Sequence, residues 1–249
     1  MKLVLAEPRL LKEGINIISE LVNDVRIKLD SNKLEIVAMD PANVAMVVFN
    51  LLSSAFVEYD VKDEESFAIN LDLFRQILGR AKPSDSIIME LDEGKNKLKV
   101  DLKGEINRSF NIGLIDLQDK AQNVPDLNFA ASVEIAAHFF SDAVDDMGIV
   151  ADSISLVADG DIFVLESSGN VSDARFEVRR SEENKFKFDN DKITKAKYSA
   201  EYLKKIVKGA RLADNVSIKF SDDYPLQVEY RVTDKLHLMT ILAPRVENK

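Results

Sequence analysis

The chain has 249 residues, no cysteine and a formal net charge of −10, so neither a disulfide framework nor a thiolate zinc site is possible. Hydrophobic residues make up 46% and charged residues 31%, which is ordinary for a globular protein, and the length suits one large domain or two of about 120 residues each. Taken alone, the acidic balance argues against a generic nucleic-acid binder, although the placement of the charges decides more than their sum. The amino terminus reaches charged residues too early for a signal peptide, and no apolar run is long enough to span a membrane.

The first half reads as short strands with two amphipathic helices. After a strand at 2–6, apolar residues recur at steps of 4, 3 and 4 and predict a helix at 9–23: Leu11, Ile15, Ile18 and Val22. A second helix at 72–81 ends before Pro83, since proline disfavours a helical residue in front of it. The remaining segments of this half predict strands at 25–29, 33–39, 44–51, 55–61, 66–71, 86–91, 97–102 and 108–114.

The middle of the chain, 114–129, has no sustained helical or strand period. It is rich in Asp, Gln and Asn, and Pro125 removes a backbone donor, so we interpret it as an extended connector. The predicted organisation is a first domain at 1–116, an interdomain connector at 117–128 and a second domain at 129–249.

The second half repeats the order of the first. Residues 74, 77, 81, 85 and 87 align with residues 129 positions later, so Asp85 falls on Asp214, and Leu10 falls on Phe139 with the same offset. This offset predicts an internal duplication; the alternative is two unrelated α+β halves that share amphipathic patterns. The predicted helices of this half lie at 137–147 and 200–211, and the apolar set of the first is Phe139, Phe140, Ala143, Val144 and Met147. The predicted strands lie at 130–135, 153–158, 162–167, 174–181, 185–188, 195–199, 217–220, 226–232 and 236–242.

Basic residues gather on the outward faces of three predicted helices, whereas the acidic excess lies largely elsewhere. A protein arranged in this way could hold a polyanion loosely, but Lys and Arg also populate any solvated helix face. The residues concerned are Lys204, Lys205, Lys208 and Arg211 on the last helix, Arg9 and Lys12 on the first, and Arg75 and Arg80 on the second.

The third predicted helix is different because its charged residues are acidic. It has no Lys or Arg, so it would repel DNA phosphate, and we expect it to pair with a basic neighbour in an adjacent subunit. The acids are Asp142, Asp145 and Asp146, and the candidate partners are Arg75, Arg80 and Lys82.

Few residues favour an enzyme. There is no cysteine nucleophile, the two histidines, His138 and His237, lack metal-ligand spacing, and no phosphate-binding or nucleophile motif occurs. The adjacent acids at 145–146 and 222–223 could be magnesium ligands, but such pairs are usually solvated surface charge. We therefore expect no catalytic activity, no metal and no cofactor, with a metal-dependent nucleic-acid enzyme as the alternative.

Three motifs occur in order along the duplicated chain: AMDPANVAMV at 38–47, FNIGLIDLQ at 110–118 leading into VPDLNF, and the terminal ILAPR at 241–245. Together they resemble the DNA sliding clamps of the proliferating cell nuclear antigen (PCNA) family, archaeal in type. The resemblance implies an α+β DNA clamp fold of two similar domains, with helices lining the inside and antiparallel sheets outside, in a trimeric ring. It also implies a polymerase processivity factor that encircles duplex DNA, with the basic helix residues named above facing phosphate.

The resemblance further implies that client proteins insert a short peptide turn into a pocket under the connector. Apolar and Met side chains make an adaptable pocket, and an extended connector can pair with a partner strand. We expect some pocket residues, Met46 and Leu242 among them, to belong to the core, and the polar Lys120 and Gln122 depart from the family's apolar connector. The implied pocket residues are Met39, Asn43, Val44, Met46, Val124, Pro125, Phe129, Pro225, Ile241, Leu242, Ala243 and Pro244.

Subunit joining in this family pairs the last strand of the first domain with a strand of the next subunit's second domain, here 108–114 and 174–180. Exposed strand edges are otherwise aggregation hazards, and closing a ring would use them. The implied interface residues are Arg80, Lys82, Arg108, Phe110, Ile112, Asp142, Asp145, Asp146, Arg175, Glu177 and Arg179.

The partners implied by the resemblance are double-stranded DNA bound non-specifically, DNA polymerase, flap endonuclease, DNA ligase and a clamp loader, with no membrane. The expected location is the cytoplasm, associated with the nucleoid, in an archaeon and the nucleus in a eukaryote. Two alternatives remain: one subunit of a heterotrimeric clamp with paralogues, and an acidic two-domain interaction scaffold without a DNA role.

Overall fold

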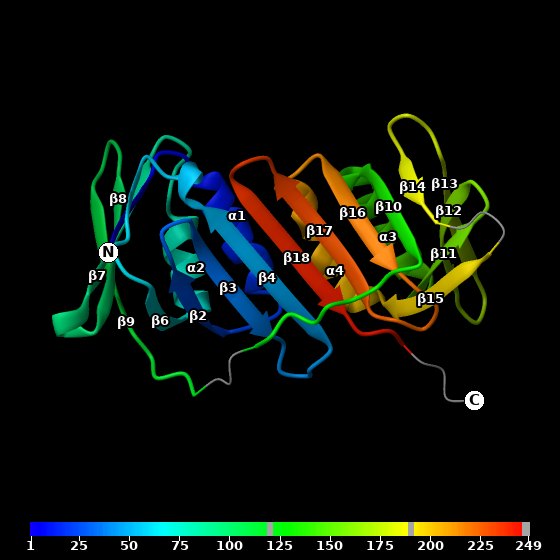
Figure 1. Ribbon diagram of the computed structural model, residues 1–249, viewed down its shortest axis with the longest axis horizontal. Helices are drawn as coiled ribbons and strands as arrows, with labels where there is room; N and C mark the ends of the chain where they lie inside the picture. The colour runs from blue at the N-terminus through cyan, green and yellow to red at the C-terminus, as the bar shows by residue number, and fades with distance from the viewer. Residues whose placement is uncertain (119–121, 189–191, 246–249) are drawn as a thin grey trace. The chain divides into compact units, whose positions relative to one another are not determined.

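The computed structural model describes residues 1–118, 122–188 and 192–245, and the chain divides into two compact units (Figure 1). Unit 1 comprises Met1–Pro41, Val47–Val124 and Val232–Leu238, and unit 2 comprises Ala42–Met46, Pro125–Arg231 and Met239–Lys249. Residues 119–121 of the predicted connector, Lys120 included, lie outside the described residues. Among the residues that are described, no helix is both long and apolar enough to cross a membrane.

The first half alternates short strands with two helices, close to the predicted order. Strand β1 lies antiparallel between β5 and β7, and β8 and β9 continue this sheet. A further run of strands has the order β4-β3-β2-β6. The elements are β1 (Lys2–Leu5), α1 (Arg9–Ile18), β2 (Asp24–Leu29), β3 (Lys33–Met39), β4 (Ala45–Leu52), η1 (Ser53–Ala55), β5 (Glu58–Asp60), β6 (Glu65–Asn70), α2 (Leu71–Gly79), β7 (Ser86–Asp92), η2 (Glu93–Lys95), β8 (Lys97–Lys103) and β9 (Arg108–Gly113).

The second half has the same sequence of elements. Strand β10 lies antiparallel between β14 and β16, β17 pairs with β16, and a separate sheet has the order β13-β12-β11-β15. The elements are β10 (Ala131–Ala136), α3 (Ala137–Val150), β11 (Ser153–Asp159), β12 (Ile162–Ser168), β13 (Asp173–Arg179), β14 (Lys185–Lys187), β15 (Thr194–Ser199), α4 (Ala200–Ile206), η3 (Val207–Arg211), β16 (Asn215–Phe220), β17 (Leu226–Val232) and β18 (Leu236–Leu242).

The strand pairings of the two halves correspond, which confirms two similar domains. Strand β1 with its neighbours β5 and β7 matches β10 with β14 and β16. Strand β2 between β3 and β6 matches β11 between β12 and β15. The same pairing order, built from sequences that share only scattered positions, is the expected result of duplication.

The helices bury the faces that their periodicity predicts. Leu11, Ile15 and Ile18 of α1 are fully buried. Helix α2 starts at the cap residue Asn70, whose side-chain oxygen accepts a hydrogen bond from the Leu73 N–H at 3.0 Å and satisfies a donor of the first turn. Figure 1 shows α1 and α2 behind β2 and β3 of the same unit.

Two helices differ in detail from the prediction. Helix α1 ends at Ile18, and one further turn follows, in which the Val22 N–H donates to the Ile18 carbonyl at 3.1 Å. Helix α3 runs past its predicted end at Met147. Phe139, predicted to be apolar core, is 41% exposed, because its neighbour Phe140 takes the fully buried position.

The last helix changes type along its length: α4 ends at Ile206 and continues as the 3-10 turn η3. Gly209 within η3 packs against the buried ring of Tyr230, where a Cβ would lie 2.2 Å from Cε2. The tighter three-residue period turns Gly209 inward, whereas Ala210 is only half-buried.

Candidate functional site

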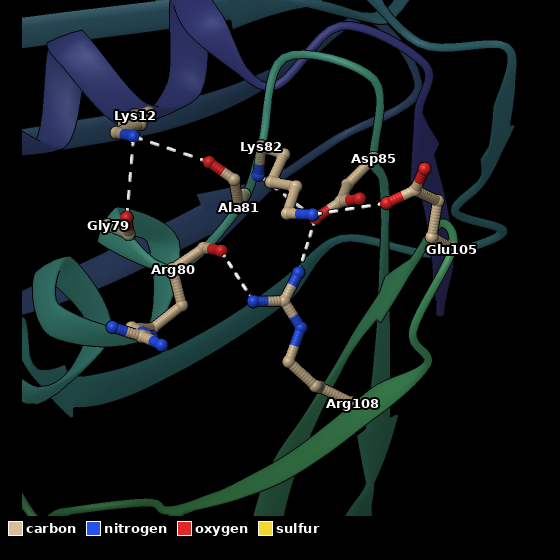
Figure 2. A network of polar contacts seen from close by, with 8 residues as sticks. All are labelled: Lys12, Gly79, Arg80, Ala81, Lys82, Asp85, Glu105 and Arg108. Carbon is tan, nitrogen blue, oxygen red and sulfur yellow. Dashed lines mark hydrogen bonds and ion pairs between the residues drawn. The ribbon is translucent and has the colours of Figure 1, made fainter.

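Two of the predicted DNA-facing lysines bind the end of a neighbouring helix in their own unit. Lys12 Nζ on α1 lies 3.5 Å from the Gly79 carbonyl oxygen and 3.4 Å from that of Ala81, where α2 ends (Figure 2). Lys204 Nζ on α4 donates to the Gly148 carbonyl at 3.2 Å, in the last turn of α3. A cation is stabilising at a helix C-terminus, so both lysines tie together the helix pair of their unit.

The other predicted DNA-facing residues differ in how far their charge is compensated. Arg75 pairs with Asp72 at 3.4 Å, and Lys205 pairs with Glu201 at 2.9 Å, each within one helix. Arg80 is exposed, and its guanidinium has no hydrogen bond or ion pair to another described residue. The three that complete the set are Arg9 and Arg211, which are exposed, and Lys208, which is half-buried.

A buried carboxylate, Asp85, ties the end of α2 to the start of β9, as Figure 2 shows. Its Oδ2 accepts the Lys82 backbone N–H at 2.9 Å and forms an ion pair with the Arg108 guanidinium. Nη1 of the same guanidinium donates to the Arg80 carbonyl at 2.6 Å. Gly104 leaves room for the carboxylate, since a Cβ there would lie 2.0 Å from Oδ1 of Asp85. Arg108, predicted to serve a subunit interface, therefore already has two partners in unit 1.

The two predicted interface strands both lie at sheet edges. Within the described residues, β9 pairs only with β8, and β13 pairs only with β12. On β13, Glu177 pairs with Arg175 at 3.4 Å and with Arg179 at 3.0 Å, and all three side chains are exposed. Phe110 on β9 is half-buried. Ile112 is 1% exposed and its side chain packs into the core, so at this position the strand edge offers its backbone, and the place of Ile112 in a subunit interface stays a prediction.

The acidic residues of α3 are uncompensated. Asp142, Asp145 and Asp146 are exposed, and none of their carboxylates forms a hydrogen bond or ion pair with another residue in the described ranges. This helix therefore presents negative charge that a cationic partner could neutralise. Over the same ranges, no group of three or more His, Cys, Asp or Glu side chains is placed to hold a metal ion.

Most residues of the predicted client pocket lie in unit 2, where two pairs of segments are in contact. The Ala243 N–H donates to the Val44 carbonyl at 2.9 Å, which joins the terminal segment to the first motif. The Phe129 ring stands edge-on to Tyr224 with centroids 6.0 Å apart, which joins the connector to the segment after β16. Asn43 has a φ of 57°, and its left-handed backbone turns the chain ahead of Val44.

Exposure separates surface residues from core residues in the predicted pocket. Met46 and Leu242 belong to the core, as expected. Ile241 is also buried, at 8% exposed, because β18 is covered on both faces there, and its assignment to the pocket stays a prediction. Tyr224 is absent from the predicted set, and its ring contacts that of Phe129. Asn43, Val124 and Pro125 are exposed, and Met39, Val44, Phe129, Pro225, Ala243 and Pro244 are half-buried.

The chain has two similar units, each built from antiparallel sheets and a pair of helices. Together with the basic helix faces and the open strand edges, this arrangement defines a duplicated clamp fold. The family model for the proliferating cell nuclear antigen N-terminal domain matches residues 1–121, and that for the C-terminal domain matches residues 123–245. The chain therefore belongs to the proliferating cell nuclear antigen family.

Relatives and solved structures agree with this assignment. The "DNA polymerase sliding clamp" of Pyrococcus furiosus is 33% identical over 233 residues, covering 94% of this chain and 93% of that protein. The protein of the same name from Nanoarchaeum equitans is 30% identical over 247 residues, covering 98% and 99%. The crystal structure of PCNA from Thermococcus kodakaraensis matches with a TM-score of 0.90 at 27% identity, covering 98% of this chain and 99% of that chain.

Proposed function

We propose that this chain is a DNA polymerase sliding clamp, a ring subunit that encircles duplex DNA and tethers the polymerase without catalysing a reaction. The match at 33% identity over 94% of the chain, to a protein of that name, carries the proposal. Basic helix faces on a chain with net charge −10 support it, because weak phosphate contacts are enough for a protein that topology keeps on the duplex.

Phosphate contacts in this proposal come from the cationic side chains of all helices except α3. Arg9, Arg80 and Arg211 are exposed, so they can approach a polyanion at little cost in burial. Lys12 and Lys204 already donate hydrogen bonds to carbonyl groups at helix ends. Because an ammonium group has three donors, each lysine can still donate a hydrogen bond to a phosphate.

Three copies close the ring in this proposal by pairing β9 of one subunit with β13 of the next. Open edges on both strands support this, since each presents unpaired backbone groups. The uncompensated Arg80 would face the acids of α3 across the same junction. A heterotrimer with paralogues is the alternative assembly. A structure described as a PCNA2–PCNA3 complex of Sulfolobus tokodaii has the same fold, with a TM-score of 0.90 at 23% identity, and this likeness does not decide between the two assemblies.

Client proteins dock on one surface of unit 2 in this proposal. The clients are polymerase, flap endonuclease, ligase and clamp loader. The surface is formed by Val44, Phe129, Tyr224, Pro225, Ala243 and Pro244. The half-buried apolar side chains and the aromatic pair support this docking site, because a peptide turn gains affinity from a preformed apolar surface.

Two measurements test the proposal. Light scattering on the purified chain should give about three times the 27.9 kDa subunit mass. With a matched clamp loader, the chain should lengthen the products of its DNA polymerase on singly primed circular DNA. A monomer that stimulates only together with paralogues would favour the heterotrimer, and no stimulation under any of these conditions would overturn the clamp function.

A further inference from the structure

The loop between β16 and β17, residues 221–225, supplies Tyr224 and Pro225 to the proposed client surface. Its own backbone holds it weakly, since the Tyr224 N–H reaches the Ser221 carbonyl only at 3.3 Å. Asp223 has a φ of 48°, in the left-handed region that residues other than glycine rarely adopt. The shape of this loop therefore depends on contacts with the rest of unit 2.

Three hydrogen bonds from other elements of unit 2 hold this loop. Two of the donors are on β15, and the third directly precedes β10. The bonds run from the Ala130 N–H to the Ser221 hydroxyl at 2.8 Å, from the Lys195 N–H to the Asp222 carboxylate at 2.7 Å, and from the Tyr198 hydroxyl to the Tyr224 carbonyl at 2.8 Å. Strand β15 belongs to the sheet β13-β12-β11-β15, whereas β16 and β17 pair with each other in a different sheet. Two of the three bonds therefore come from a strand of the other sheet.

The Tyr198 bond is the best shielded from water of the three. Tyr198 is fully buried, whereas the other two bonds lie at exposed positions. Burial raises the pKa of the Tyr198 hydroxyl, which therefore keeps its proton and remains a donor. Removing one partner of a buried hydrogen bond is costly, because water replaces it less readily there than at the surface. Of the three bonds, we expect this one to fix the loop most firmly.

The Tyr224 carbonyl belongs to the peptide group that joins the two client-surface residues of the loop. That group is planar, so holding its oxygen constrains the backbone at both Tyr224 and Pro225. Because Pro225 has no N–H, the carbonyl is the only hydrogen-bonding atom that this peptide group offers. The Tyr224 ring in turn stands edge-on to Phe129, with centroids 6.0 Å apart. One buried hydroxyl thus constrains both rings that the loop contributes.

Strand β15 also holds the terminal segment of the client surface. The Arg245 N–H, directly after Pro244, donates to the Lys197 carbonyl at 2.7 Å. Lys197 and Tyr198 are consecutive in β15, so neighbouring residues of one strand bind both the 221–225 loop and the terminal segment. A surface anchored in this way is already ordered before a peptide binds.

We propose that Tyr198 is a positioning residue of the client surface, an inference that rests on the proposed clamp function. Its side chain is 0% exposed, so it does not touch a client peptide. It acts through Tyr224 and Pro225, because its bond to the Tyr224 carbonyl keeps the loop in the shape that the peptide meets. A loop that is already ordered loses less conformational entropy on binding, so the peptide binds more tightly.

Fluorescence anisotropy on the full-length protein measures this effect. The probe is a labelled peptide with the sequence of the clamp-binding segment of an archaeal DNA polymerase. Tyr198→Phe removes the hydroxyl and keeps the ring, and it should weaken peptide binding about fivefold, the effect of one ordinary hydrogen bond. The measurement is made well below the unfolding temperature of every variant, so that the folded fraction stays constant.

Two control variants separate positioning from a loss of stability. Tyr230→Phe makes the same substitution at a buried residue of the same unit, but the Tyr230 hydroxyl has no hydrogen-bond partner in the described part of the chain. Ser167→Ala removes a buried hydroxyl that donates to the Ser153 carbonyl at 2.9 Å, within the sheet of β15. Both variants should bind the peptide as tightly as wild type, whatever their stability.

Ser221→Ala loosens the same loop from its exposed side, because it removes the acceptor of the Ala130 N–H, and it should weaken binding about twofold. Wild-type affinity in Tyr198→Phe, or an equal loss in Tyr230→Phe or Ser167→Ala, would overturn the role of Tyr198 alone. If Tyr198→Phe does not fold, wild-type affinity in Ser221→Ala would overturn the dependence of the client surface on this loop. If the wild-type chain does not bind the peptide, the client surface itself is refuted, and this inference with it.

Discussion

The guanidinium of Arg108, on the first residue of β9, forms an ion pair with the Asp85 carboxylate, whose side chain is only 1% exposed. One arginine thus connects the turn after α2 with the beginning of the edge strand that the proposed ring uses. The position of that edge therefore depends on a contact inside unit 1.

We expect Arg108→Ala to destabilise the chain by about 3 kcal/mol, because it leaves the buried Asp85 carboxylate without its counter-charge. Chemical denaturation measures the loss. The matched control is Glu105→Gln, which removes the exposed ion pair to Lys82 at 3.3 Å and should cost less than about 1 kcal/mol. Equal stability of the two variants would show that the pair contributes nothing beyond a surface contact.

Gly209→Ala should destabilise by about 2 kcal/mol, since the new methyl group would meet the Tyr230 ring at 2.2 Å in a packed core. Gly79→Ala is the natural comparison, because no atom lies within 4 Å of its Cβ position, and it should be neutral or stabilising by about 0.5 kcal/mol. Thermal unfolding of both variants checks the pair. A Gly209→Ala protein as stable as wild type would mean that Tyr230 can move aside.

Acid should weaken the link between β8 and β9. Burial alone would raise the pKa of Asp101, but the Ser109 hydroxyl on the facing strand and the Lys99 ammonium, 3.0 Å from Oδ2, outweigh it and lower the pKa below its usual value. A lowered folded-state pKa means that ionised Asp101 stabilises the fold above the unfolded-state pKa of about 3.9, and that this contribution is lost as the pH falls through the folded-state pKa. Denaturation of wild type and Asp101→Asn should differ at pH 7 and converge toward pH 3; a constant difference would contradict the assignment.

Lys208→Glu/Arg211→Glu should reduce polymerase stimulation severalfold on primed circular DNA, because carboxylates replace cations in the proposed DNA lining. This pair is preferable to Lys204, whose replacement would also remove the hydrogen bond to Gly148. Lys62→Glu/Lys235→Glu changes the same charge at exposed loop positions and should leave stimulation intact. Raising the salt concentration should lower wild-type activity toward that of the variant, and a salt-independent difference would point to a folding defect.

Arg80→Glu should raise the concentration at which the oligomer dissociates by about tenfold, because it sets like charge against the acids of α3 in the proposed junction. Light scattering on dilution measures this. Arg75 lies on the same helix but is already paired with Asp72, so Arg75→Glu should have a smaller effect on dissociation of the oligomer. Restoration of the oligomer by combining Arg80→Glu with Asp146→Arg would identify the partner, whereas an unchanged mass in Arg80→Glu would remove α3 from the junction.

Local sequence patterns were enough to predict the architecture of the chain. Alternating and helical periods placed nearly every strand and all the helices, because side chains on one face of an element must repeat with its geometry. The offset of 129 residues exposed the duplication, since equivalent core positions keep similar side chains. The basic residues and the three family motifs could also be read directly from the chain.

Contacts between residues distant in sequence were decided only by the tertiary structure. No pattern distinguishes Asp85, buried by Arg108, from its aligned counterpart Asp214, which is exposed. Nor does periodicity show that Lys12 and Lys204 bind the ends of other helices, or that the Tyr198 hydroxyl binds the Tyr224 carbonyl. Sequence alone determined the duplicated clamp and its charge, because those properties are local and repeated. The partner of each charge depends on which segments pack together, and that is settled only when the chain has folded.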